Sequence, residues 1–445
     1  MWLNDRLKEF SKNIAIISDD VEFSYAELVE RINYYRTELT NCGIKSGHKV
    51  IVISEFSFES VSLIIAIITM KCVYIPISAE SNIELRKIKK ISGCDWEVSF
   101  NNENRMTIKS EITEVKAQLI ENISKENEAA MVLFSSGSTG EPKGIVYRLD
   151  KTLSKFIEKK RPTIAIPFLL MDHFGGFNTI MALLSSGSQI ITISQRSVDT
   201  VLNAIEKHNV ELFPTTPSFL SMIVASELWQ NKDLSRLKRI TYGTEIMPKT
   251  LLNRVSKIFP HCTLQQTYGL SEVGVLRTRS KSNNSIGIEI GGPGFDFEIR
   301  NNILWIKSEY SMEGYLNAPS PFDNNGWMNT QDVVELDGEF IIIKGRNSDI
   351  INVGGQKVYP SEVEDAILEI NEIEDVVVYG EENILLGQSV ACRVKCRPLE
   401  DNEKRKLKKR IRTFCKSKLA PFKVPVRIQF TSGEIVSPRQ KKIRR

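Results

Sequence analysis

The feature that most constrains this chain is a polar loop, FSSGSTGEPKGI at residues 134–145, which follows the apolar run AAMVL. A phosphate loop of the Walker type requires GxxxxGK[ST] between a strand and a helix. Here Lys143 follows a proline, no serine or threonine comes after it, and the next residues, GIVYR, are typical of a strand. The pattern therefore predicts a loop that joins two strands, and it argues against the kinase and GTPase classes that use a Walker loop.

The same loop nevertheless has the chemistry of a phosphate cradle. Glycines let backbone N–H groups come close to an anion, while hydroxyl groups and an ammonium group supply further donors. The alternative, on this motif alone, is a polar loop without special function. The candidate phosphate-binding residues are Ser135, Ser136, Gly137, Ser138, Thr139, Gly140 and Lys143.

Length and composition place the chain among ordinary globular proteins. It has 445 residues, of which 41% are hydrophobic and 26% charged, and this length exceeds what one compact core usually holds. The formal net charge of +4 gives no reason to expect a nucleic-acid partner. Basic residues gather in EKRKLKKRIR and in the final KKIRR, and the first of these segments is expected to form a solvated helix face.

Targeting and metal signals are weak. The N-terminus mixes charged and apolar residues, and the longest apolar segment, residues 61–70, is far shorter than the ~20 residues of a membrane helix. We therefore expect a cytoplasmic protein without a transmembrane segment. Seven cysteines without a CxxC pair, and four histidines without ligand spacing, argue against a structural metal site.

Strand and helix signals alternate along the chain, which predicts an α/β fold. Ser24 and Glu27 form a capping box before one amphipathic helix, and Pro248 opens another. A break near residue 345 separates an expected large N-terminal domain, residues 1–345, with β-sheets flanked by helices, from a small, mobile α+β domain, residues 346–445. In the latter, Ser361 and Glu364 are expected to cap the helix EVEDAILEI.

The loop SSGSTGEPKG resembles the signature of the adenylate-forming superfamily, which includes acyl-CoA synthetases, adenylation domains of peptide synthetases and beetle luciferases. Other segments match in the expected order, so the resemblance covers nearly the whole chain. It implies ATP as a substrate, bound through the loop donors already named, with Thr139 among the catalytic groups.

The segment QTYGLSEVG is similar to the family pattern YGxSE. The resemblance implies that Tyr268 stacks on adenine and that Glu272 is a catalytic residue that helps to hold Mg²⁺. A π-face suits a purine, and a carboxylate is a hard oxygen ligand. The segment TYGTEIMP resembles the stretch along the other side of adenine. The remaining nucleotide-binding residues implied here are Gly269, Leu270, Ser271, Gly243, Thr244 and Glu245.

Two further segments resemble acyl-CoA synthetases. In WMNTQDVVELDG the family usually has TGD, so Asp332 is implied to accept the ribose hydroxyls, although Gln331 replaces the glycine. In GRNSDIINVGGQKVYPSEVE, Arg346 is implied to contact ribose or phosphate, and Ser348 stands at the hinge position, where Asp or Lys is usual. In the same segment Gly354 and Gly355 are implied to let a thiol approach the backbone.

The C-terminal match is the weakest. In SPRQKKIRR, Lys442 aligns with the catalytic lysine that bridges the substrate carboxylate and the α-phosphate, and Lys441 replaces the usual glycine. Either lysine has the reach for this role, and a basic tail without function is the alternative. No general base is needed when a carboxylate attacks phosphorus, because the barrier is mostly charge repulsion that cations and N–H donors reduce.

The segment IPFLLMDHFGGFN resembles the stretch that places His173 against the acyl carboxylate, and Gly243 is implied to line the same pocket. A packed histidine, or an amine-binding role for Asp172 as in amino-acid-activating relatives, remains an alternative. The leading hypothesis is activation of a fatty or aryl acid as an acyl-adenylate, with transfer to coenzyme A. One rival hypothesis is transfer to the phosphopantetheine of a carrier protein, and the other is a non-catalytic nucleotide-binding protein. An acidic carrier protein would suit the basic residues Lys406, Lys408, Lys409 and Arg410.

Overall fold

The computed structural model describes residues 2–79, 84–101, 105–111, 117–136, 141–431 and 435. Within them the chain divides into two compact units, which we describe separately. The first comprises residues 1–214, 269–275 and 307–327, and the second comprises residues 215–268, 276–306 and 328–445. The domain boundary expected at residue 345 stays a prediction. No helix in the described ranges is long and apolar enough to cross a membrane.

The first unit contains a mixed sheet with strand order β20-β8-β7-β4-β3-β5-β6. β3 pairs in parallel with β4 and β5, and β4 with β7, whereas β6, β8 and β20 join in antiparallel fashion. The strands are β3 Lys49–Ile53, β4 Val73–Ile77, β5 Trp96–Phe100, β6 Met106–Ser110, β7 Ala130–Ser136, β8 Pro142–Arg148 and β20 Gly314–Tyr315.

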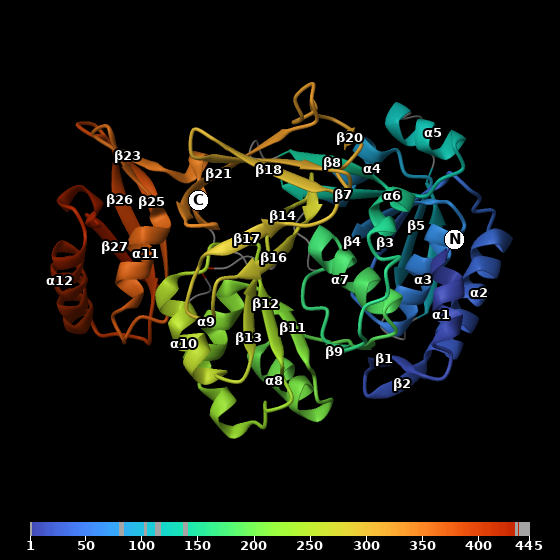
Figure 1. Cartoon of the computed structure of the whole chain (residues 1–445), viewed down its shortest axis with the longest axis horizontal. Helices are drawn as coiled ribbons and strands as arrows, with labels where there is room; N and C mark the ends of the chain where they lie inside the picture. Colours follow the sequence, from blue (N-terminus) through green and yellow to red (C-terminus); the bar gives the residue numbers. More distant parts are fainter. Residues whose placement is uncertain are drawn as a thin grey trace. The chain divides into compact units, whose positions relative to one another are not determined.

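Helices cover both faces of this sheet because the strand side chains alternate between two cores. Val52 and Leu133 face one core, which includes residues of α2, α3 and α7. Ile51 and Val132 face the other, which includes residues of α4 and α5. The two sets of helices lie on opposite sides of the strands (Figure 1). Their bounds are α2 Tyr25–Asn41, α3 Phe58–Thr69, α4 Leu85–Ser92, α5 Gln118–Lys125 and α7 Phe174–Ser185.

The remaining elements of the first unit include strands β1 and β2, which pair in antiparallel fashion, and β9 and β10, which pair in parallel; β1 also pairs with β10. The predicted capping box is confirmed: Glu27 N donates to Ser24 Oγ at 3.2 Å, and Ser24 N donates to Glu27 Oε2 at 2.7 Å. The bounds are α1 Trp2–Glu9, β1 Ile14–Ser18, β2 Val21–Ser24, α6 Leu149–Ser154, β9 Ile164–Ala165, β10 Gln189–Ile191, α8 Val198–Lys207, β11 Leu212–Thr215, β14 Gly269–Leu270 and β15 Gly274–Val275.

The second unit has a strand pair, β12 with β13, and a sheet of order β16-β17-β22-β21-β19-β18. The helix expected after Pro248 is confirmed as α10, with Leu251, Leu252 and Val255 buried. The bounds are α9 Pro217–Ser226, β12 Arg239–Tyr242, α10 Lys249–Ile258, β13 Thr263–Gln266, β16 Arg277–Ser280, β17 Ile288–Gly291, β18 Phe295–Arg300, β19 Ile303–Ser308, β21 Met328–Asp337 and β22 Phe340–Arg346.

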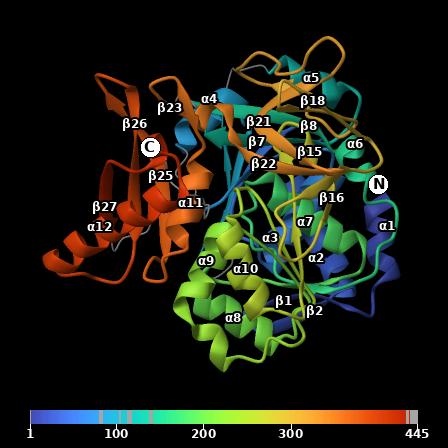
Figure 2. The same ribbon diagram turned by 60° about the vertical axis from the view of Figure 1, so that its left-hand side comes forward.

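The C-terminal part of the second unit has its own apolar core, shared by strands β23 to β27 and helices α11 and α12 (Figure 2). From α11 it takes Val363 and Ile367, and from α12 it takes Leu407, Ile411 and Cys415. The bounds are β23 Ile351–Val353, β24 Gln356–Val358, α11 Pro360–Leu368, β25 Asp375–Asn383, β26 Gly387–Lys395, α12 Asp401–Lys418 and β27 Arg427–Thr431. Short 3₁₀ turns lie at Asn347–Asp349 and Pro421–Lys423 in this part, and at Leu228–Asn231 after α9.

The capping box expected at Ser361 and Glu364 is wrong. α11 begins at Pro360, a favoured first residue because its fixed φ suits a helix and its missing N–H is not needed there. Ser361 Oγ instead donates to Lys344 O at 2.6 Å. Glu364 is buried, and its Oε1 accepts from Val378 N on β25 at 2.9 Å, so this carboxylate joins the helix to the sheet.

Candidate active site

The polar loop joins β7 and β8, two antiparallel strands in which Ser135 lies opposite Lys143. The predicted strand–loop–strand arrangement is therefore confirmed. Gly137, Ser138, Thr139 and Gly140 lie outside the described residues, as does the side chain of Ser136. Asn317 holds the far end of the loop, because its Nδ2 donates to Pro142 O at 2.8 Å and its Oδ1 accepts from Gly144 N at 3.0 Å.

Tyr315 connects the expected phosphate lysine to the expected metal ligand. Lys143 Nζ lies 5.4 Å from the centroid of the Tyr315 ring, a cation–π distance. The Tyr315 hydroxyl donates to Glu272 Oε1 at 2.7 Å. Burial and the Glu272 charge raise the pKa of Tyr315, so the phenol remains a hydrogen-bond donor. These three side chains therefore form one cluster in the first unit.

Sequence reasoning missed Tyr315 and Asn317. Both belong to the segment GYLN, which lies about 170 residues from the loop in sequence and reaches it because β20 pairs with β8. A two-residue strand leaves no periodic signal. Only the strand pairing identifies these residues as neighbours of Lys143.

Glu272 lies in the turn between β14 and β15, the segment that holds the other candidates Gly269, Leu270 and Ser271. A Cβ atom on Gly269 would lie 2.6 Å from Gly274 O, so this position requires glycine for the strands to approach. Met312 N donates to Glu272 O at 2.9 Å and fixes the backbone of the turn. The carboxylate is half-buried and is held by Tyr315.

A single carboxylate fits Mg²⁺, because this ion keeps several waters and usually binds through one or two carboxylates plus substrate phosphates. The described part of the chain has no group of three or more His, Cys, Asp or Glu residues that could hold a metal by itself. Glu272 is thus suited to an ion that arrives with a nucleotide.

His173 is the N-cap of α7. Its Nδ1 accepts from Gly175 N at 3.0 Å, so in the neutral ring the proton is on Nε2, which can donate to a carboxylate. Gly176 lets the start of this helix approach the preceding loop, since a Cβ atom there would lie 2.1 Å from Leu170 O. The structure thus gives His173 a capping role and leaves its acyl role a prediction. The adjacent Asp172 is 5% exposed.

In the second unit, Gly243, Thr244 and Glu245 follow β12. A Cβ atom on Gly243 would lie 2.3 Å from Thr267 Oγ1, so glycine allows this backbone to pass close to the residue before Tyr268. Thr244 has a φ of 68°, a left-handed conformation that is uncommon for a β-branched residue. Glu245 Oε2 accepts from Ser218 N at 3.1 Å and Oγ at 2.6 Å, so it ties the segment to the first turn of α9.

Tyr268 and Asp332 form a buried pair. The Tyr268 hydroxyl lies 2.5 Å from Asp332 Oδ2, and the two residues are 8% and 6% exposed. Arg346 Nε lies 3.5 Å from Asp332 Oδ1 and is itself exposed. Burial raises the pKa of Asp332, and the Tyr268 hydrogen bond and the Arg346 charge partly oppose this rise. Burial also raises the pKa of Tyr268. The structure thus brings together three residues that the sequence places up to 78 positions apart.

Gln331 occupies a position that favours glycine. Its φ is 62°, in the left-handed region, and its N–H donates to Asn329 Oδ1 at 2.8 Å. The turn therefore forms with glutamine in place, at the steric cost that L-residues have in this region. Asp332 remains on β21, opposite Arg346 on β22.

The candidates for domain movement and thiol access lie next in the chain. Ser348 belongs to an exposed 3₁₀ turn, and its Oγ donates to Asp349 Oδ1 at 3.1 Å. Gly354 and Gly355 form the two-residue connection between β23 and β24, with φ values of 57° and 84°. Positive φ at both positions is the requirement of a tight type I′ hairpin, which few other residues meet. Lys441 and Lys442 lie outside the described residues.

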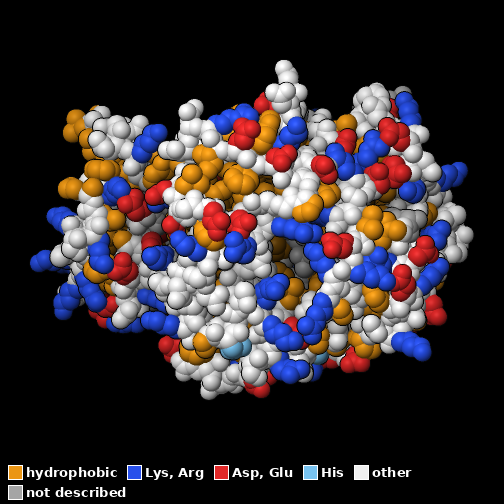
Figure 3. Space-filling view, in the orientation of Figure 1, with side chains coloured by type: hydrophobic (Ala, Val, Ile, Leu, Met, Phe, Trp, Pro, Cys, Tyr) orange, Lys and Arg blue, Asp and Glu red, His pale blue; other side chains and the backbone are white. Residues whose placement is uncertain are grey.

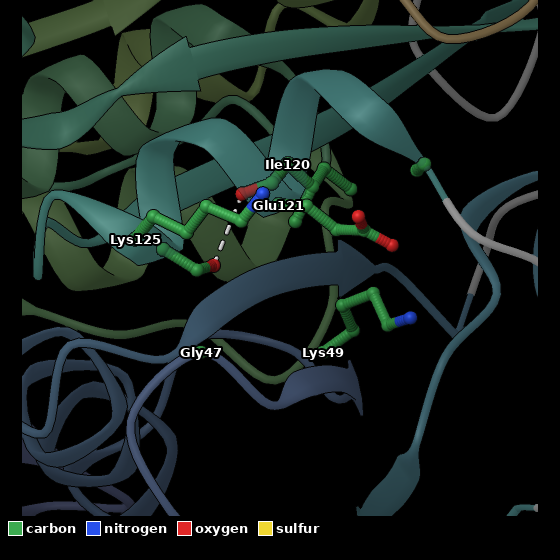
Figure 4. Close-up of a pocket in the computed structure, with 7 residues that line it drawn as sticks. Gly47, Lys49, Ile120, Glu121 and Lys125 are labelled. Carbon is green, nitrogen blue, oxygen red and sulfur yellow. Dashed lines mark hydrogen bonds between the residues drawn. The ribbon is translucent and has the colours of Figure 1, made fainter.

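One pocket lies apart from all of these candidates, between β3 and α5 (Figure 4). Lys49 and Glu121 project into it, and Ser124 Oγ donates to Ile120 O at 3.0 Å. This pocket shares no residue with the expected site.

The described residues of the expected site fall into two groups. The first unit holds Ser135, Lys143, His173, Gly269, Leu270, Ser271 and Glu272; the second holds Gly243, Thr244, Glu245, Tyr268, Asp332, Arg346, Ser348, Gly354 and Gly355.

An α/β chain with a glycine-rich strand–loop–strand motif and a small C-terminal α+β part has the form of an adenylate-forming enzyme. The family model of AMP-binding enzymes matches residues 3–316, and that of the AMP-binding enzyme C-terminal domain matches residues 362–442. The chain therefore belongs to the AMP-binding enzyme family.

Known relatives agree with this assignment. The chain is 27% identical over 360 residues to acyl-CoA synthetase 7 of Caenorhabditis elegans, a match covering 73% of this chain and 65% of that protein. It is 23% identical to the 2-succinylbenzoate–CoA ligase of Bacillus pumilus (strain SAFR-032), covering 96% and 93%. A crystal structure of an anthranilate CoA ligase with anthranoyl-AMP superposes with a TM-score of 0.84 at 16% identity, covering 99% and 95% of the two chains. This last likeness shows a shared fold.

Proposed function

We propose that this protein uses ATP to activate a carboxylic acid as an acyl-adenylate and then transfers the acyl group to the thiol of coenzyme A. The observation that carries the proposal is the Lys143–Tyr315–Glu272 cluster at the end of the β7–β8 loop. It places a cation and a carboxylate beside the segment that resembles the family's phosphate loop. Family membership and the names of the relatives support the same reaction class.

In the first step a carboxylate oxygen of the acid attacks the α-phosphorus of ATP, and the bond from that phosphorus to the β-phosphate oxygen breaks. Pyrophosphate leaves with both electrons of that bond. Two anions must approach each other, so positive charge lowers the barrier. We assign this role to Lys143, the backbone N–H groups of the loop, and Lys442 at the C-terminus. Mg²⁺ held by Glu272 would neutralise phosphate charge when bound.

The nucleotide is assigned to residues of the second unit as well. A carboxylate can accept hydrogen bonds from both hydroxyls of a ribose, and Asp332 is held for this by Arg346 and the β21 backbone. The Tyr268 hydroxyl occupies one carboxylate oxygen in the structure, so ribose binding would exchange or share that hydrogen bond. Gly243 and Glu245 would lie along the adenine.

In the second step the sulfur of the thiol attacks the carbonyl carbon of the adenylate and the thiol proton is released to solvent. The carbon–oxygen bond to AMP breaks, and AMP leaves with both electrons of that bond. We assign thiol approach to the Gly354–Gly355 turn and the change of conformation to Ser348. A phosphopantetheine arm on an acidic carrier protein is the alternative acceptor. Its support is the solvent face of α12, where Arg405, Lys406 and Lys409 are exposed; Figure 3 shows basic side chains gathered over this helix.

The proposed substrate is a fatty or aryl acid without a free α-amine. His173 supports this class, because its Nδ1 accepts from Gly175 N and its Nε2–H is then the donor suited to an acyl oxygen. The relatives named above act, by name, on acyl and 2-succinylbenzoate substrates.

The test is pyrophosphate release from Mg-ATP against a panel of fatty, aryl and amino acids, each with and without coenzyme A. Release that depends on one acid class, with formation of its acyl-CoA, is the expected result. Acid-dependent release without a thioester would replace coenzyme A by a carrier-protein acceptor. Tight AMP binding without release for any acid would overturn the proposal in favour of a nucleotide-binding protein without turnover.

A further inference from the structure

Lys155, directly after α6, has a buried ammonium group that the activity proposed above does not use. The Nζ atom has no hydrogen-bond partner among the described residues. Three aromatic rings surround it, with centroids 5.1 Å away at Phe156, 5.3 Å at Phe174 and 5.8 Å at Tyr310. An ammonium that has lost its water shell gains from such ring faces, since cation–π attraction strengthens with desolvation.

Phe174 is the ring through which this lysine reaches the expected active site. It is the first residue of α7, it follows His173 in sequence, and it is 2% exposed. Its other contacts also belong to the first unit. The ring stacks on Tyr147 at 4.8 Å, and its Cε1 would lie 3.6 Å from a Cβ atom at Gly274, two residues after Glu272.

We propose that Lys155 is a positioning residue for the acyl site: its ammonium, enclosed by Phe156, Phe174 and Tyr310, holds Phe174 and thereby fixes His173 at the start of α7. The inference rests on the proposed function, because the acyl role of His173 belongs to that proposal. Lys155 itself touches neither substrate nor nucleotide in this account.

The protonation state of Lys155 decides how strongly its Nζ group is attracted to the rings of Phe156, Phe174 and Tyr310, which we call the aromatic cage. Burial, with a smaller contribution from the positive charge of Lys160, lowers the pKa of Lys155 to about 7. Other charged or titratable groups on the surrounding elements are Lys151 and Glu158 near α6, Asp172 and His173 before α7, Tyr147 on β8, and Glu309 and Tyr310 in the 307–327 segment. Below neutral pH the cage holds a cation, and above it a neutral amine that the rings attract less.

This charge dependence gives a readout that a merely structural lysine would not produce. The KM for the acid should rise by about threefold to tenfold as the pH increases through 7, as expected when a cation–π contact of this class is lost. The KM for ATP should stay within about twofold, because the rings around Lys155 belong to Phe156, Phe174 and Tyr310, none of which is assigned to the nucleotide.

The principal variant is Lys155→Met, in which a flexible thioether fills the same space without charge. We expect its KM for the acid to be independent of pH and close to the value of the unmodified protein at high pH. Lys151→Met is the matched control: it removes one positive charge from α6 itself, at a side chain that is exposed and pairs with Glu313 at 3.4 Å. This control should keep the original pH dependence.

Phe174→Leu serves as a second variant in case the methionine variant does not fold. It keeps the lysine but removes the ring through which the ammonium acts on His173, so the change in the KM for the acid near pH 7 should largely disappear. For all four proteins we would measure the initial rate of pyrophosphate release across about pH 6 to 8.5. The acid is varied at saturating Mg-ATP to give its KM, and Mg-ATP is varied at saturating acid to give the KM for ATP.

Two results would overturn the inference while the proposed function stands: a KM for the acid that does not change near pH 7, or a Lys155→Met variant that keeps the original pH dependence. A Phe174→Leu variant that keeps the full change in KM for the acid near pH 7 would also count against it. If the unmodified protein releases no pyrophosphate with any acid, the proposed function itself fails, and the inference fails with it.

Discussion

Replacing Tyr268 with phenylalanine removes a hydroxyl that lies 2.5 Å from Asp332 Oδ2 inside the second unit. A hydrogen bond to a charged group contributes about 1.5 to 3 kcal/mol to the free energy of unfolding. Removing one partner costs this full amount when the other partner stays buried without a replacement. Asp332 is 6% exposed, and among the described residues Arg346 is the one opposite charge that pairs with it. We therefore expect the free energy of unfolding to fall by about 2 kcal/mol near neutral pH.

The pH dependence of this loss follows from Asp332. Burial raises its pKa, and the Tyr268 hydrogen bond opposes that rise. The folded state thus takes up a proton more readily than the unfolded chain, and the contribution of Asp332 to stability falls as the pH rises from the ordinary aspartate pKa through the raised one. Without the hydroxyl the pKa rises further. The cost of Tyr268→Phe should therefore be small near pH 4 and larger near pH 8.

Urea unfolding of Tyr268→Phe, Asp332→Asn and the double variant measures the coupling between the two groups. Tyr379→Phe is the matched control, since its hydroxyl donates only to the neutral Gln429 at 3.3 Å in the same unit. It should cost about 0.5 to 1.5 kcal/mol at every pH. A coupling energy below about 0.5 kcal/mol between Tyr268 and Asp332, or a cost of Tyr268→Phe that does not vary with pH, would refute the reasoning.

Three further changes test the proposed site. Glu272→Ala should lower Mg-dependent pyrophosphate release by at least about tenfold while AMP affinity, measured by calorimetry, changes little, because the carboxylate would act on the metal and phosphates. Lys442→Ala should slow adenylate formation by about 100-fold or more yet spare thioester formation from supplied acyl-adenylate; the same loss in Lys441→Ala instead would exchange the two roles. Gly243→Ala places a Cβ atom 2.3 Å from Thr267 Oγ1 and should destabilise the protein by about 1 to 3 kcal/mol, measured by thermal unfolding, and weaken AMP binding.

The sequence was most informative where a local pattern carries its own physical cause. Ser24 and Glu27 satisfy two helix N–H groups within four residues, so no distant contact is needed to form that cap. The strand–loop–strand arrangement around Lys143 followed from the missing Walker residues and the strand-like GIVYR. The cap expected at Ser361 failed because both side chains found partners elsewhere: Ser361 bonds Lys344 O, and Glu364 bonds β25.

Residue types and motif order thus determined which groups are candidates: a loop rich in donors, a YGLSE segment and an aspartate after a turn. Only the tertiary structure decided which of them meet. Tyr315 reaches Glu272 through the short β20 strand, Tyr268 binds Asp332 across 64 positions, and Lys155 is enclosed by rings from three separate segments. Such contacts leave no spacing signal, because they depend on how strands pair and helices pack rather than on the period of any one element.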